Sequence, residues 1–474
     1  MPSGLRPNSI PGIRRAGVSS HRYHSPAGEV REIGIRRHFV LAIVFVTVSA
    51  AGAAMAGIPE IRALVGLVPA ATTGAPTPSA DAPSAPASSA TPVPSATLRP
   101  ASPYVPALID RPGVRDRLQA ALDAGRLTLA APGVVASVLF ADGRQWTGVS
   151  GVADIATGRP LTARTPFALA SVSKTFLAAE CLALVDEGLL RLDQAVAPLL
   201  PGVLVGGYAI DPQITIRQLL DHTSGLADYL VDRKLELAVL AEPTAVWTPT
   251  MALAYARRPV AAPGAGYHYA NTNYVLLGLV AERLTGRTLA EEYRARFFEP
   301  LGLTTATYQG LEPPVGDLPT AYRYGSSALN AKPVDVTDGT DIRPFTAITT
   351  AAGAAGSVAA SAADAARWAR ALYGGYVLPA ADVAAMIADA TATARLRPGF
   401  PYGLGVQVLR IDGRISYGHS GRLVGARSVV RWFPGEGIAI AVVTNESRFD
   451  PTTILRDLLA IVAPESGREG PRPD

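Results

Sequence analysis

Ser171 and Lys174 stand three residues apart at the start of an apolar segment that ends near Gly188. Side chains at this spacing lie on one face of a helix, so the lysine amine can approach the serine hydroxyl. The 43 basic residues comprise three lysines and 40 arginines. Arginine keeps its proton in proteins, whereas a desolvated lysine can act as a base. The pair therefore predicts a serine nucleophile beside a lysine base, with an ordinary surface pair as the alternative.

Two further segments carry groups that could complete a catalytic site. Tyr269 and Asn271 follow a turn-rich stretch before a helix, and in an extended loop they would point to the same side. The alternative is a tyrosine that only packs against this helix. Residues 417–422 place small residues, Gly418, Ser420 and Gly421, on or beside a strand, where backbone can approach a ligand closely. The alternative for this run is an ordinary bulge or strand end.

Other catalytic and metal-binding motifs are absent from the sequence. There is no Gly-x-Ser-x-Gly elbow and no His-Glu-x-x-His helix. Cys181 is the only cysteine, which excludes an internal disulfide and a cysteine metal cluster, and we expect it to be buried. Asp335, Asp338 and Asp341 lack the spacing of a calcium loop and indicate a solvated turn. We therefore expect neither a metal nor a cofactor.

The three motifs occur in order along the chain, and together they resemble the penicillin-recognising serine hydrolases. The resemblance is to the branch that holds class C β-lactamases and DD-carboxypeptidases, and Ser-x-x-Lys is a known signature of the wider group. It extends over about residues 107–463, and the stretches 219–226, 271–278 and 356–364 also look similar. One such motif is weak support, but three in order are specific.

The resemblance implies a role for each motif residue. Ser171 would be the nucleophile that forms an acyl-enzyme, and Lys174 and Tyr269 would move its proton in an order that the sequence leaves open. The backbone N–H groups of Ser171 and of the residue after the third motif would hold the oxyanion. The residues that would bind the substrate are Asn271, His419, Ser420, Gly421 and Arg422.

This sequence departs from the family pattern at two positions. Many relatives carry lysine where His419 stands, and a mostly neutral histidine gives Tyr269 less electrostatic help at pH 7. Relatives often have a second glycine where Arg422 stands. Arg422 or Arg427 could hold a substrate carboxylate, or could be an exposed arginine in an arginine-rich chain.

Strands are expected at both ends of residues 107–465, with helices between them. A helix over 112–124, ended by Gly125, precedes two strands joined by a turn at Asp142-Gly143. The C-terminal strands are expected over 402–410, 415–418, 427–433 and 438–444. This order predicts an α+β fold, in which an antiparallel sheet is flanked by helices and interrupted by an inserted all-α subdomain.

The N-terminal part differs in composition from this serine hydrolase domain. Residues 1–38 hold seven arginines and two glutamates, so the net charge of +4 becomes −1 for the remainder, which gives no indication of nucleic-acid binding. Residues 39–58 carry no charge and predict a cleaved signal or a membrane anchor. Residues 59–106 form a linker, and Ala, Pro, Ser and Thr make up 30 of the 37 residues in 70–106. Residues 466–474 are expected to be a disordered tail.

These features predict an extracytoplasmic serine hydrolase, anchored in the membrane through residues 39–58 or secreted. The expected substrates are small molecules or peptides, above all peptidoglycan-type D-amino-acid peptides or β-lactams. Two alternatives remain: an esterase on the same fold, and a catalytically silent module that binds or senses the cell wall. The rate of deacylation cannot be read from the sequence. No nucleic-acid partner is expected, and a monomer is favoured.

Overall fold

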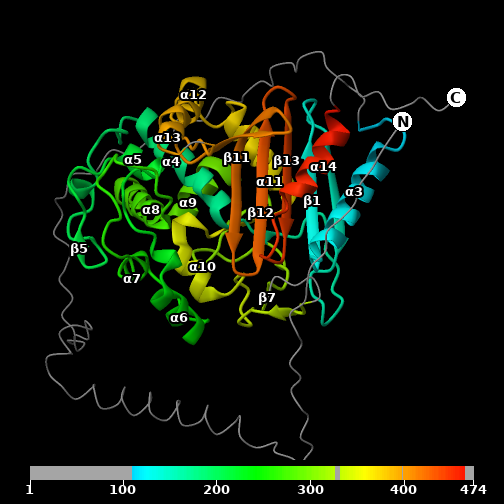
Figure 1. Cartoon of the computed structure of the whole chain (residues 1–474), viewed down its shortest axis with the longest axis horizontal. Helices are drawn as coiled ribbons and strands as arrows, with labels where there is room; N and C mark the ends of the chain where they lie inside the picture. Colours follow the sequence, from blue (N-terminus) through cyan, green and yellow to red (C-terminus); the bar gives the residue numbers. More distant parts are fainter. Residues whose placement is uncertain (1–108, 326–330, 398, 465–474) are drawn as a thin grey trace, which may run out of the picture. The chain divides into compact units, whose positions relative to one another are not determined.

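The computed structural model describes residues 109–325, 331–397 and 399–464 (Figure 1). The predictions made for the N-terminal segment, the anchor or signal, the linker and the C-terminal tail fall on residues 1–38, 39–58, 59–106 and 466–474, which lie outside the described residues. Among the helices that the structure does describe, none has the length and apolar character needed to cross a bilayer.

A six-stranded antiparallel sheet forms the centre of the described residues, in the order β10-β11-β12-β13-β1-β2. The strands are β1 (Gly133–Leu139), β2 (Gln145–Gly151), β10 (Gln407–Ile411), β11 (Arg414–Leu423), β12 (Ala426–Phe433) and β13 (Ile438–Thr444). β1 pairs with β13 in the register Val134–Thr444, so the two ends of the domain share one sheet. The predicted antiparallel α+β architecture is confirmed.

Helices cover both faces of the sheet because alternate side chains of its inner strands point in opposite directions. Val134 and Val138 of β1 belong to one hydrophobic cluster, whereas Val135 between them belongs to the other. The first cluster lies under α3 and α14, which pack together in Figure 1, and the second lies against α11. These helices are α3 (Val114–Leu129), α14 (Thr452–Val462) and α11 (Ala362–Tyr373).

The predicted all-α insertion lies between the short strands β3 (Phe167–Ala168) and β9 (Val358–Ala360). Its helices are α4 (Ser173–Asp186), α5 (Ile216–Leu220), α6 (Arg233–Ala241), α7 (Pro249–Leu253), α8 (Asn271–Thr285), α9 (Leu289–Tyr293) and α10 (Thr346–Ala352). Threonine side chains cap the N-termini of α5, α7 and α9, which explains where these short helices begin.

Short strands and two further helices complete the described chain. β6 (Thr307–Tyr308) joins β3 and β9 in a three-stranded sheet, and the pairs β4 (Leu204–Val205) with β5 (Tyr208–Ala209) and β7 (Tyr322–Tyr324) with β8 (Pro333–Asp335) form hairpin-like ribbons. α12 (Ala380–Ala388) and α13 (Ala390–Leu396) precede β10.

Three predicted boundaries were wrong. The strand expected over 415–418 extends from Arg414 to Leu423, because its pairing with β12 continues to Leu423 and Ala426. α3 continues through Gly125 to Leu129. A Cβ atom at position 125 would lie 2.4 Å from Cγ1 of Ile454. The glycine therefore permits close packing of α3 on α14 and does not end the helix. The strand expected from Tyr402 begins only at Gln407, because Gly405 adopts a φ of 73° that extended backbone does not allow.

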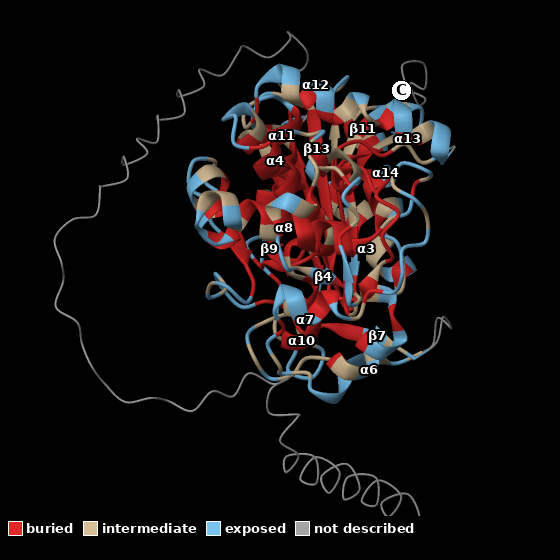
Figure 2. Cartoon of the chain, turned by 90° about the vertical axis from the view of Figure 1, so that its left-hand side faces the viewer, coloured by how far each residue is buried: buried red, intermediate tan, exposed pale blue. Residues whose placement is uncertain are grey.

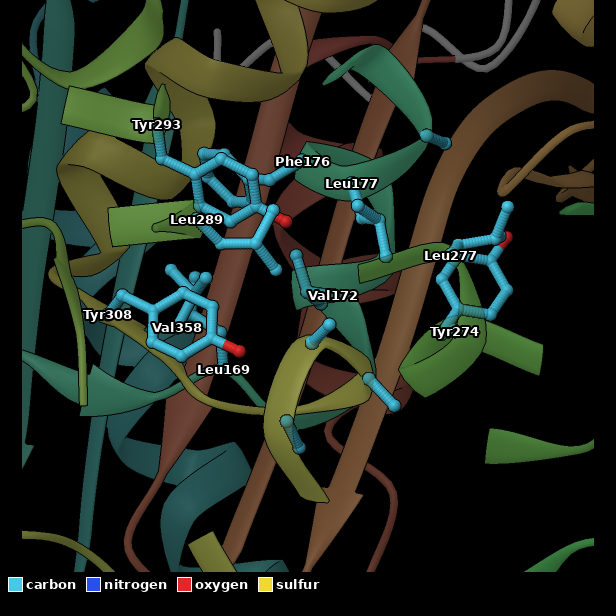
Figure 3. Close-up of a cluster of buried hydrophobic side chains, with 14 of the residues drawn as sticks. Leu169, Val172, Phe176, Leu177, Tyr274, Leu277, Leu289, Tyr293, Tyr308 and Val358 are labelled. Atoms are coloured by element: carbon cyan, nitrogen blue, oxygen red, sulfur yellow. The ribbon is translucent and has the colours of Figure 1, made fainter. Parts of the chain in front are cut away.

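The packing beneath the Ser171 turn is tight and aromatic (Figure 3). The ring of Phe176 stacks on Trp368 at 3.9 Å between centroids, and Tyr293 lies 5.9 Å from Phe176. Val172 and Leu169, which flank Ser171 in sequence, are buried in the same cluster. Figure 2 shows that buried residues fill the sheet and the inner helices, so the turn rests on a rigid base.

Candidate active site

Ser171 lies in a 3₁₀ turn (Ala170–Val172) that leads directly into α4. Ala170 has a φ of 49°, an uncommon left-handed conformation for a residue with a side chain. The hydroxyl of Ser428 on β12 holds the turn from the sheet side by donating a hydrogen bond of 2.7 Å to the Leu169 carbonyl. The serine therefore sits on a fixed, strained turn at the start of a helix.

Lys174 lies one turn further on, completely buried, with three acceptors around its amine. Nζ lies 3.1 Å from Ser171 Oγ, 2.7 Å from Asn271 Oδ1 and 2.8 Å from the Ala355 carbonyl. Burial lowers the Lys174 pKa to about 7, and the Asp228 carboxyl partly opposes this shift. Near neutral pH the amine is therefore present in both its charged and its neutral form.

Tyr269 reaches Ser171 from the opposite side, immediately before α8. Its hydroxyl donates a hydrogen bond of 2.9 Å to Ser171 Oγ. Burial raises the pKa of Tyr269 above its usual value, so the phenol keeps its proton at neutral pH. The ring packs against His222 at 4.2 Å between centroids, which restricts how the phenol can turn.

Asn271 connects Lys174 to a carboxyl group that the sequence analysis did not identify. Its Nδ2 donates to Asp228 at 3.0 Å to Oδ2 and 3.2 Å to Oδ1, while its Oδ1 accepts from Lys174. The Asp228 carboxylate also accepts the backbone N–H of Asn271 at 3.1 Å. Burial raises the pKa of Asp228, and its hydrogen bonds and the charge of Lys174 oppose this.

His419 on β11 is buried and held between two partners. Its Nδ1 lies 2.6 Å from the Ser420 carbonyl, which can only accept, so Nδ1 carries the proton. Nε2 then accepts from the hydroxyl of Tyr402 at 2.9 Å. Burial, with a contribution from the charge of Lys174, lowers the His419 pKa to about 3. The histidine is therefore neutral at physiological pH, as the sequence analysis anticipated for a residue in place of lysine.

Gly421 permits β11 to touch the Ser171 turn. A Cβ atom at this position would lie 2.1 Å from the Leu169 carbonyl and 2.3 Å from Ser428 Oγ. No side chain fits there without moving the strand. The close approach sets Arg422 on the rim of the cleft that holds Ser171.

The cleft has a volume of about 800 Å³ and brings together seven of the eight residues expected from the sequence. They are Ser171, Tyr269, Asn271, His419, Ser420, Gly421 and Arg422. The eighth, Lys174, lies beneath its floor and contacts Ser171 and Asn271. Within the described residues no cluster of His, Cys, Asp and Glu side chains could hold a metal ion.

The arginines of the cleft differ in their surroundings. Arg422 on β11 lies directly opposite Arg427 on β12, and Arg427 forms an ion pair of 3.0 Å with Asp450. Arg422 is exposed and forms no ion pair with any described residue. Arg323 and Arg448 line the cleft as well.

Several residues that structure the site were not expected from the sequence. These are Asp228, Tyr402 and Gln407. His222 was expected to structure a loop, and its contacts agree with this role, because its Nδ1 accepts the backbone N–H of Ala270 at 3.2 Å. The only available signal for Asp228 was its place two residues beyond the stretch 219–226 that resembles the family. His268 is exposed and Cys181 is buried, as expected for residues without a role.

Comparisons with known proteins point to one family. The family model described as Beta-lactamase matches residues 115–463. Penicillin-binding protein 4 of Amycolatopsis lactamdurans is 34% identical over 364 residues, which cover 73% of this chain and 89% of that protein. Esterase EstB of Burkholderia gladioli is 32% identical over 244 residues, 49% of this chain and 60% of the esterase. The crystal structure of a D-stereospecific amidohydrolase from Streptomyces sp. superposes with a TM-score of 0.61 at 31% identity, covering 73% of this chain and 98% of that one.

Proposed function

The chain belongs to the beta-lactamase family of serine hydrolases, and from this premise we propose that it cleaves amide bonds beside D-amino acids through an acyl-enzyme on Ser171. One observation carries the proposal. Ser171 Oγ accepts from Tyr269 at 2.9 Å and lies 3.1 Å from Lys174 Nζ, so the nucleophile touches both groups that can move its proton. A catalytically silent module has no need of this arrangement around a buried amine.

Lys174 takes the first proton. Asn271 Oδ1 and the Ala355 carbonyl can only accept, so they hold two N–H bonds of the neutral amine and leave its lone pair facing Ser171 Oγ. The Tyr269 phenol is protonated and donates to the same oxygen, so it cannot serve as the base in this state. Neutral His419 adds no charge that would ionise the phenol.

Acylation then follows in two steps, attack on the carbonyl carbon and departure of the amine. Ser171 Oγ attacks the carbonyl carbon as its proton passes to Lys174, and the N–H groups of Ser171 and Arg422 hold the oxyanion. As the C–N bond breaks, Tyr269 gives its proton to the departing amine, and the proton on Lys174 restores the phenol. Water next attacks the acyl group through the same residues and releases the acid with Ser171 restored.

The D-amino-acid substrate class rests on the relatives and on the cleft. A penicillin-binding protein and a D-stereospecific amidohydrolase are among the chains similar to this one. The cleft has a volume of about 800 Å³, which can hold a short peptide, and it is lined by arginines that can hold a terminal carboxylate. We extend the proposal to β-lactams and to peptides of the cell wall. The apolar residues 39–58 support an extracytoplasmic location, either anchored or secreted.

An esterase is the second candidate, and the similarity to esterase EstB favours it. Ester cleavage needs the same nucleophile and base, but less help from Tyr269, because an alkoxide or phenolate leaves more readily than an amine. The two functions therefore differ in how strongly they depend on the Tyr269 proton.

Intact-mass spectrometry of the full chain tests both candidates. We expect penicillin G and p-nitrophenyl acetate each to add one acyl group, and N-acetyl-D-alanyl-D-alanine to be hydrolysed. Ser171→Ala should abolish all three reactions. Ser416→Ala should retain them, because Ser416 Oγ only donates to the Leu409 carbonyl within the sheet. An adduct that persists on the Ser171→Ala protein contradicts the mechanism, and labelling by the ester alone favours the esterase.

A further inference from the structure

The guanidinium of Arg431 on β12 is buried without an acidic partner. The residue is 2% exposed and forms no ion pair with any acid in the described part of the chain. Among the described residues its hydrogen-bond partner is Gln407 alone, with Nη1 3.0 Å from the backbone carbonyl and Nη2 2.5 Å from Oε1. Burial lowers the Arg431 pKa to about 10, so the group is charged at neutral pH. Burying an uncompensated charge is costly, which is unexpected for a residue that only packs.

The side chain of Arg431 crosses one whole strand to reach Gln407. Arg431 pairs with Gly418 of β11, and Gly418 pairs with Gln407 of β10. Directly paired residues share a face of the sheet, so the guanidinium passes over Gly418. A Cβ atom at 418 would lie 2.0 Å from the Val430 carbonyl, so this position stays without a side chain.

The orientation of the Gln407 amide determines which atoms of Ser420 donate and which accept a hydrogen bond. Arg431 only donates, so it holds the Oε1 end of the Gln407 amide. Oε1 also accepts the Ser420 N–H at 3.1 Å, which uses both of its lone pairs. Ser420 Oγ lies 3.3 Å from Nε2 and 3.4 Å from Oε1 of Gln407. Because the two shorter contacts already fill the lone pairs of Oε1, Ser420 Oγ accepts from Nε2. With its oxygen accepting from Gln407, the Ser420 hydroxyl has its proton available for another acceptor.

Ser420 lies where β11 becomes the open edge of the sheet. Pairing with β10 ends at Gln407 and Gly418, so no strand in the described part of the chain pairs with residues 419–423 on that side. Both Gln407 and Ser420 line the catalytic cleft together with Ser171. A hydroxyl fixed at this edge faces whatever substrate lies along it.

We infer that Arg431 and Gln407 are positioning residues that set Ser420 as a hydrogen-bond donor to an acceptor oxygen of the bound substrate. The inference rests on the proposed function, since it describes how that site holds a peptide. This role explains why the charge of Arg431 is buried at this position. Arg431 orients the Gln407 amide, and the amide determines that the Ser420 hydroxyl accepts from Gln407 and donates to another group.

The test compares two substrates on the full chain. N-acetyl-D-alanyl-D-alanine presents acceptor oxygens along the cleft, whereas p-nitrophenyl acetate places only an acetyl group at Ser171. In Gln407→Glu the new carboxylate pairs with Arg431 but accepts the Ser420 proton instead of donating. We expect the ratio of kcat/KM for the peptide to kcat/KM for the ester to fall by at least about tenfold. Arg431→Lys should retain more of this ratio than Arg431→Met.

Arg410→Met on β10 is the matched control, because Arg410 is exposed and donates only to the Gly413 carbonyl. It should leave the ratio unchanged. The inference is overturned if Gln407→Glu keeps the original ratio, or if both rates fall by the same factor, which would be a structural effect. If the unsubstituted chain is not acylated at Ser171, the proposed function fails, and this result is distinct from a change in the ratio. Should Arg431→Met fail to fold, Gln407→Glu and Arg431→Lys still decide.

Discussion

Asp228 accepts a hydrogen bond of 3.0 Å from the Nδ2 atom of Asn271, and this bond determines which end of the Asn271 amide faces Lys174. With Nδ2 held by the carboxylate, Oδ1 must face the amine, where it accepts at 2.7 Å. A reversed amide would present N–H groups to the ammonium and leave the carboxylate facing an oxygen. Asp228 is therefore connected to Ser171 through two intervening side chains, Asn271 and Lys174, and its charge raises the Lys174 pKa.

Asp228→Asn should move the acidic limb of the pH–rate profile to lower pH. The Asp228 charge raises the Lys174 pKa, so removing it stabilises the neutral amine and lowers that pKa below about 7. The measurement is the rate of Ser171 acylation by p-nitrophenyl acetate between pH 4 and pH 9. Asp193→Asn is the control, since Asp193 pairs only with Arg217, outside the cleft. A limb that stays in place in Asp228→Asn would contradict the coupling.

The unsubstituted enzyme should gain activity as the pH rises through about 7. Lys174 must lose its proton to act as the base, and its pKa lies near this value. His419, with a pKa of about 3, stays neutral over this range and therefore does not cause the rise in activity. His419→Gln should therefore keep the midpoint, whatever its effect on the maximal rate. If the rate of the His419→Gln variant no longer rises near pH 7, the rise depends on the histidine and not on Lys174.

Tyr269→Phe should impair amide cleavage more than ester cleavage. The variant removes the proton donor for the departing amine, and a general acid typically contributes about 10²–10⁴-fold to the rate. A p-nitrophenolate leaves without that proton, so acylation by p-nitrophenyl acetate should fall much less. Stopped-flow acylation with both substrates gives the comparison.

Tyr293→Phe is the matched control for this loss of a hydroxyl. The hydroxyl of Tyr293 is buried in the core beneath Ser171 and has no hydrogen-bond partner among the described residues (Figure 3). Its removal should change neither rate. Equal losses for amide and ester in Tyr269→Phe would show that the phenol only positions Ser171.

Gly421→Ala should reduce both stability and acylation. The new Cβ would meet the Leu169 carbonyl at 2.1 Å, so β11 must move away from the Ser171 turn. Overpacking of this kind typically costs about 1–3 kcal/mol. Gly435→Ala is the control, because a Cβ there meets nothing within 4 Å and its φ is not left-handed. Thermal unfolding and Ser171 labelling measure the two effects, and a Gly421→Ala protein as stable as the control would refute the close approach.

The sequence predicted the elements whose signals are local. The Asp142-Gly143 hairpin and the strands expected over 427–433 and 438–444 depend on neighbours within a few residues, and they lie close to where they were expected. Gly125 and the residues after Tyr402 were misread because their reason is tertiary. Gly125 is opposed by Ile454 across the helix pair, and no local pattern reports that contact.

The sequence by itself determined the residue types of the proposed catalytic site and one distance: Ser171 and Lys174 lie one helical turn apart, so their contact follows from local geometry. It also supplied the order of motifs that indicated the family. Only the tertiary structure decided the rest of the site. Asp228 and Asn271 are 43 residues apart, and Gln407 of β10 meets Arg431 of β12 across the intervening strand β11. Sheet register and the packing of the insertion create these contacts, and side-chain spacing along the chain carries no information about either.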